Sequence, residues 1–149
     1  MTVHYEMFTE AFLLKVSEHD FLRFPDEERQ AITDRYMKMA CAKFAEVCKY
    51  DITSGDDYNR QYVFDQATDS EVDEILDIVS EGMLMYWLKP VLYKQENLEL
   101  ILNNVDYSAY SPAELTKQVK AVYTDCRKHF TDLINDYSYR HGDLSDLHL

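Results

Sequence analysis

The residues SPAELTKQVKAVYTDCRKHFTDLINDY, at positions 111–137, decide the fold class. They open with an N-cap serine, a proline at the first helical position and a glutamate at the third, a combination that favours helix initiation. Apolar residues then recur at steps of three and four, which places them on one helix face. These residues are Leu115, Val119, Val122, Tyr123, Cys126, Phe130, Leu133, Ile134 and Tyr137. The stretch therefore predicts a long amphipathic helix that ends shortly before Gly142.

Helical periodicity also marks the segments that precede this stretch. A short amphipathic helix is expected over about 5–16, and a wide apolar face over about 25–49 indicates a central helix with a proline at its start. A capping box at Thr68–Glu71 begins a third helix. Pro90 is expected to kink or end that helix, because proline removes a backbone donor and clashes with the preceding turn. A further helical piece is expected over about 91–103.

The segment of about 51–68 is the least regular part of the chain. Residues 54–57 (Ser-Gly-Asp-Asp) are typical of a turn, and residues 62–64 fit either a short strand or an extended packing segment. Only 3 Gly and 3 Pro occur in the sequence, which argues against many short strands. The prediction is therefore an all-α fold, a helical bundle of four to five helices in one domain over residues 1–141. An extended C-terminal docking tail, residues 142–149, is expected to follow it.

The bulk composition limits the classes of partner. The 149 residues carry a net charge of −13, and such a field repels nucleic acid and anionic membranes. No apolar run approaches the roughly 18–20 residues that a membrane span needs. The three cysteines are an odd number and no secretory signal is evident, so we expect reduced, buried thiols.

Motifs that would carry catalysis or bind a metal are missing from the sequence. No two of the five histidines are three or four residues apart, so no helical metal-binding pair exists. There is no C-x-x-C, no glycine-rich phosphate loop and no G-x-S-x-G. The sequence therefore predicts that the protein is not an enzyme and needs no metal or cofactor.

Tyrosines and a leucine-bearing tail are the features that indicate protein contacts. The chain has 12 Tyr, a residue that is enriched at interfaces because one end is apolar and the other forms hydrogen bonds. The alternatives are half-buried tyrosines that cap the core, and a tail that packs back on its own bundle. The candidate partner-binding residues are Asp106, Tyr107, Tyr110, Tyr137, Tyr139, His141, Asp143, Leu144, Leu147 and Leu149.

A series of short motifs resembles the head–tail connector, or neck adaptor, proteins of tailed bacteriophages. The series covers about Phe21 to Leu144 and consists of Trp87-Leu88-Lys89-Pro90, Glu96-Asn97-Leu98, Asp106-Tyr107, Tyr110-Ser111-Pro112-Ala113-Glu114-Leu115, Tyr137-Ser138-Tyr139 and Gly142-Asp143-Leu144. The resemblance implies a helical subunit of a homo-oligomeric ring, often a dodecamer, that binds the portal protein and an adjoining neck or tail protein. It also implies no catalytic residue or cofactor, and a place in the virion neck after synthesis in the host cytoplasm.

The acidic surface has two functional interpretations. In a connector ring, acidic residues such as Asp56 and Asp57 would face the channel and keep DNA from adhering as it passes. The alternative is a small acidic protein that mimics DNA and inhibits a host DNA-binding enzyme. Such an inhibitor would stay a monomer or dimer and bind a basic protein, whereas a connector would bind portal particles.

Overall fold

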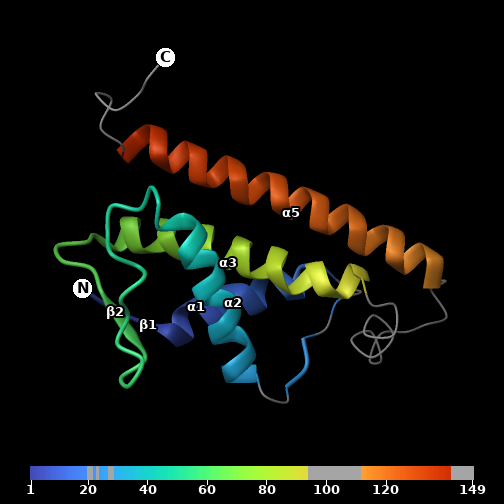
Figure 1. The fold of residues 1–149 in the computed structure, drawn as a ribbon, viewed down its shortest axis with the longest axis horizontal. Helices are drawn as coiled ribbons and strands as arrows, with labels where there is room; N and C mark the ends of the chain where they lie inside the picture. Colours follow the sequence, from blue (N-terminus) through green and yellow to red (C-terminus); the bar gives the residue numbers. More distant parts are fainter. Residues whose placement is uncertain (20–21, 23, 27–28, 94–111, 142–149) are drawn as a thin grey trace.

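The computed structural model describes residues 1–19, 22, 24–26, 29–93 and 112–141. Within them it confirms the all-α prediction, with a small pair of antiparallel strands added to the helices (Figure 1). The elements in chain order are β1 (Thr2–His4), α1 (Tyr5–Ser17), α2 (Arg29–Phe44), β2 (Gln61–Val63), α3 (Asp69–Tyr93) and α5 (Pro112–His141). The predicted tail, residues 142–149, lies outside the described residues.

Helix α3 is the centre of the bundle, and α1, α2 and α5 each pack against it. From Ile78 to Leu84 every residue of α3 is buried, because neighbouring helices cover it on several sides. Gly82 makes a close approach of these helices possible. A methyl group added there would lie 2.7 Å from the Phe130 ring of α5 and 2.8 Å from the Ala40 methyl of α2. In Figure 1, α5 runs along the length of α3.

The two ends of α3 test two local predictions. At the start, the Thr68 hydroxyl accepts a hydrogen bond from the Glu71 N–H at 3.2 Å, and the Glu71 carboxylate accepts one from the Thr68 N–H at 3.4 Å. The predicted capping box is therefore confirmed. The helix does not end at Pro90, as one alternative expected, but continues to Tyr93. Trp87 and Leu88, one turn earlier, are buried and hold this last turn against the bundle.

Helix α2 is shorter than expected, since it begins at Arg29 and ends at Phe44 rather than spanning about 25–49. The chain then turns, with the Val47 N–H donating to the Phe44 carbonyl at 3.1 Å. This turn starts the irregular segment earlier than the composition suggested. The helix still supplies the core with one face, which includes Met37 and Ala40.

The strand pair joins the amino terminus to the irregular segment. β1 and β2 are antiparallel, with Val3 opposite Tyr62, and the pairing extends to hydrogen bonds between Met1 and Phe64. Residues 61–63 thus adopt the strand that the sequence left open. Strand β1 was not predicted, because three residues are too few to show a period of two.

Candidate interaction surfaces

The loop that precedes β2 closes on itself and exposes an aromatic side chain. Asp56 and Gln61 exchange backbone hydrogen bonds of 2.8 and 3.1 Å. The Asp56 carboxylate accepts hydrogen bonds from the Asn59 side-chain amide (2.7 Å) and backbone N–H (3.1 Å), which hold the pKa of Asp56 below its ordinary value. Tyr58 lies between these residues and is 94% exposed, the most exposed large apolar side chain of the described chain. The loop is therefore a structured turn that presents Tyr58 to solvent.

Arg60 anchors this loop to α1 and α2. Its backbone has a left-handed φ of 55°, and its carbonyl accepts a hydrogen bond of 3.0 Å from the Tyr5 N–H. Its guanidinium donates to Glu6 at 2.9 Å, pairs with Asp34, and lies 5.5 Å from the centre of the Tyr5 ring. The pKa of Arg60 is raised, first by the hydrogen bond to Asp34. These contacts join three segments that are far apart in the sequence.

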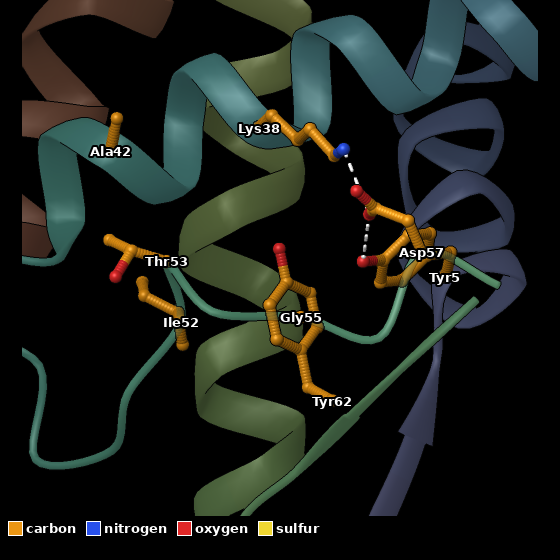
Figure 2. Close-up of a pocket in the computed structure, with 8 residues that line it drawn as sticks. All are labelled: Tyr5, Lys38, Ala42, Ile52, Thr53, Gly55, Asp57 and Tyr62. Carbon is orange, nitrogen blue, oxygen red and sulfur yellow. Dashed lines mark hydrogen bonds and ion pairs between the residues drawn. The ribbon is translucent and has the colours of Figure 1, made fainter. Parts of the chain in front are cut away.

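A cavity of about 160 Å³ lies between α2, this loop and β2, and Figure 2 shows the side chains around it. Within it the Tyr5 hydroxyl donates to Asp57 at 2.7 Å, and the Lys38 ammonium lies 2.9 Å from the same carboxylate oxygen. The pKa of Asp57 is lowered by Lys38 first and then by Tyr5, whereas burial raises the pKa of Tyr5. Because the pockets of drug-sized ligands usually measure about 300–1,000 Å³, this cavity is too small to enclose a ligand of that size.

Two of the predicted partner-binding residues, Tyr137 and Tyr139, lie near the carboxyl-terminal end of α5 and differ in exposure. Tyr137 is buried, packs edge-on against Phe44 with ring centres 4.8 Å apart, and accepts a hydrogen bond of 3.1 Å from the Lys49 N–H. The prediction that Tyr137 binds a partner is therefore wrong. Its place in the helical stripe, opposite α2 and α3, directs the ring into its own core. Tyr139, two residues on, is 73% exposed and is free for contacts.

The last turn of α5 is fixed by charge to the start of α3. Arg140 pairs with Glu74 of α3 and, at 3.4 Å, with Asp136 one turn back. His141 lies 3.4 Å from Glu74, and its ring centre is 4.3 Å from that of Tyr137. The predicted partner-binding residue His141 is thus engaged within its own chain, and Tyr139 is the exposed aromatic residue beside it.

A buried carboxylate, Glu81, joins α1, α3 and α5. It is 7% exposed, and the Lys15 ammonium lies at 2.9 Å from one oxygen and His129 Nδ1 at 3.2 Å from the other. Burial first, and then Glu81, raise the pKa of the neighbouring Cys126 thiol to about 12, so this thiol stays protonated and does not act as a nucleophile at neutral pH. The cluster therefore fixes three helices together. Sequence reasoning missed it, although a single acid within the apolar run of α3 was a signal.

The remaining predicted residues have different outcomes. Asp56 and Asp57 are exposed but also hold the loop, and their orientation towards a channel stays a prediction. The other predicted partner-binding residues lie outside the described residues: Asp106, Tyr107, Tyr110, Asp143, Leu144, Leu147 and Leu149. Within the described ranges, no group of three His, Cys, Asp or Glu side chains is placed to hold a metal ion. None of the helices described is long and apolar enough to cross a membrane.

Comparisons with protein-family models, with curated proteins and with solved structures give no match to this chain.

Proposed function

We propose that this protein is a virion structural protein, a head–tail connector subunit that forms a ring below the portal of a tailed bacteriophage. The observation that carries the proposal is that the clustered polar side chains of the bundle contact one another, whereas two aromatic side chains are exposed. The Arg60, Asp57 and Glu81 clusters are all used in internal contacts, whereas Tyr58 and Tyr139 are left to solvent. Such a surface suits contacts with other polypeptides better than it suits a reaction.

The arrangement of the exposed aromatic residues supports this function. Tyr58 belongs to a loop that is tied by hydrogen bonds, and Tyr139 to a helix end that is tied by ion pairs, so neither needs to be ordered when a partner binds. Preorganised aromatic side chains bind with a small entropic cost. The described end of α5 and the β1–β2 pair lie towards the same end of the molecule (Figure 1). That end is our candidate for contact with the portal or the adjoining neck protein.

The acidic DNA mimic remains the second candidate, and the internal ion pairs weaken it. A DNA mimic needs carboxylates that are free to meet a basic host protein. Several of the carboxylates are instead engaged by cations of the same chain, among them Asp34, Asp57, Glu74 and Glu81. The connector is therefore preferred.

The test is binding to portal particles. Mixing the purified chain with portal-bearing heads should add ring-shaped density at the portal vertex in electron micrographs. The double variant Tyr58→Ala, Tyr139→Ala should reduce the fraction of decorated heads. Leu14→Ala is the matched control. It removes an exposed apolar side chain of α1 that does not belong to the aromatic pair, Tyr58 and Tyr139. Undecorated heads with the unaltered chain would reject the connector, and tight binding to a basic host enzyme would favour the mimic.

Channel-facing carboxylates can be tested in the same particles. Asp56→Asn and Asp57→Asn remove charge but keep an oxygen that accepts the hydrogen bonds from Asn59 and Tyr5. If these residues line the channel, the neutral variants should slow genome release, because DNA would be repelled less. If the rings still form and the genome is released at the unaltered rate, Asp56 and Asp57 do not line the channel.

A further inference from the structure

Charge is unevenly divided between α5 and residues 1–93 of the sequence. Residues 1–93 contain nine Lys and Arg against nineteen Asp and Glu, a net charge of −10. Helix α5 contains five Lys and Arg against four Asp and Glu, which leaves +1. A protein with a net charge of −13 thus carries one helix that is slightly basic.

Four of the five Lys and Arg residues of α5 gather on one face. With 100° per residue, the four residues Lys117, Lys120, Arg127 and Lys128 fall within an arc of about 100°. All four are exposed, and none forms an ion pair with a described residue. The acids of α5 lie on the next face round the helix, and its buried residues face the other helices of the bundle. We call Lys117, Lys120, Arg127 and Lys128 the basic stripe.

An acidic stripe runs along the first third of α3. Asp69, Asp73 and Asp77 are exposed and follow one another at steps of four, so they lie on one face. Asp69 and Asp73 have no ion pair within the described residues, and Asp77 contacts Lys15 of α1. Asp69 and Asp77 are eight residues apart, as are Lys120 and Lys128, so each pair spans about 12 Å along its helix.

The two stripes cannot meet within one molecule. The side of α3 that faces α5 is marked by Glu74, which contacts Arg140 and His141. With 100° per residue, Asp69 and Asp73 lie about 100–140° round α3 from Glu74, and the basic stripe is centred about 130° round α5 from the buried residues of that helix. Two complementary patches on different faces form a heterologous contact, and repetition of such a contact builds a ring or a filament rather than a closed pair.

We propose that the basic stripe of α5 in one copy binds the acidic stripe of α3 in the next copy, head to tail. The inference rests on the proposed function, since it assigns the surface through which the connector ring closes. A second copy fits better than nucleic acid for two reasons. The net charge repels a polyanion, and the acids beside the basic stripe, such as Asp125 and Asp132, would also meet its phosphates.

Charge reversal with rescue tests this contact. One variant carries Lys120→Glu and Lys128→Glu, and the other carries Asp69→Lys and Asp73→Lys. Each alone should self-associate at least about tenfold more weakly than the unaltered chain. A mixture of the two should regain association, because each reversed stripe then meets its opposite. Lys43→Glu with Lys89→Glu is the control, with the same change of net charge on exposed lysines outside both stripes.

Sedimentation velocity measures the association, and circular dichroism verifies that each variant is folded. Association should be present in about 0.15 M salt, where long-range repulsion is already screened, and weaker in about 1 M salt, where contact pairs are screened too. A chain that stays monomeric up to about 1 mM, or reversed variants that associate as well as the unaltered chain, would overturn the inference. So would duplex DNA binding that Lys120→Glu with Lys128→Glu abolishes. Decoration of portal particles is a separate readout, so the connector function can stand if this contact fails.

Discussion

The α3–α5 contact and the β1–β2 end of the molecule both bury apolar side chains, but they differ in what the ion pairs do. Along α3 and α5, apolar side chains such as Phe130 pack against a helix that has a glycine at a point of close approach. At the strand pair, Arg60 and Asp57 use charge to join a loop to α1 and α2. Burial stabilises both regions, whereas the ion pairs of Arg60 and Asp57 set the position of an exposed loop. Each of the two regions can be destabilised separately by substitution.

Phe130→Ala should have the largest effect, on the apolar side. The ring is 2% exposed, and its removal leaves a cavity beside Gly82. We expect the free energy of unfolding to fall by about 3–5 kcal/mol, the usual cost of deleting a buried aromatic ring. Urea unfolding followed by circular dichroism measures it. Thr131→Ala, at an exposed position next in the chain, is the control and should cost little. A loss below about 1 kcal/mol for Phe130→Ala would mean that α5 does not pack as described.

Gly82→Ala tests the same contact by adding an atom. The new methyl would overlap the Phe130 ring and the Ala40 methyl, at a cost of about 1–3 kcal/mol for overpacking. Alanine's better helix propensity returns up to about 1 kcal/mol, so we expect a net loss of about 1–2 kcal/mol.

The double variant Gly82→Ala with Ala40→Gly sharpens this prediction. Removing the Ala40 methyl opens space for the new one, so the two changes should not be additive. Additive losses in urea unfolding would show that α2 and α3 are not in close contact at this point.

At the strand pair, the variants Arg60→Ala and Arg60→Gly distinguish the contribution of the Arg60 side chain from that of its backbone conformation. Both remove the links to Glu6 and Asp34, which are partly exposed and so contribute only about 1 kcal/mol. Alanine should cost about 1 kcal/mol more than glycine, because the residue has a φ of 55°. Hydrogen exchange should quicken at β1 and β2 and stay unchanged in α3. Equal acceleration in α3 would contradict the division into two independently held regions.

The two regions also differ in how far the sequence predicts them. The apolar spacing of Phe130 and Tyr137 indicated α5, and Thr68 with Glu71 marked the start of α3, because both signals are local. Strand β1 and the Arg60 cluster depend on residues about 30 to 60 positions apart, for which no local pattern exists.

The prediction for Tyr137 was wrong for the same reason. Tyrosine composition indicated contacts with partners, but which tyrosines are exposed depends on how the helices pack. The same pattern therefore gave both Tyr137, which is buried, and Tyr139, which is exposed.

The smallest expected effect concerns Glu71, where the cap of α3 meets the turn after α2. The hydrogen bond of 2.7 Å from the Tyr50 hydroxyl is the first cause that lowers the pKa of Glu71 from 4.5 to about 2, and Lys49 adds to it. A lowered pKa in the folded state stabilises the fold above the unfolded value of 4.5. That contribution is lost as the pH falls from 4.5 towards about 2.

Glu71→Gln should therefore flatten the dependence of the unfolding free energy on pH in this window, since the amide keeps an acceptor for Tyr50 but no longer titrates. Urea unfolding at a series of pH values from about 6 to about 2 measures the slope. Tyr50→Phe should flatten it as well, because that variant removes the first cause of the lowered pKa. If both variants keep the slope of the unaltered chain, acid sensitivity lies elsewhere, and the ion pairs of the loop around Asp57 become the next group to titrate.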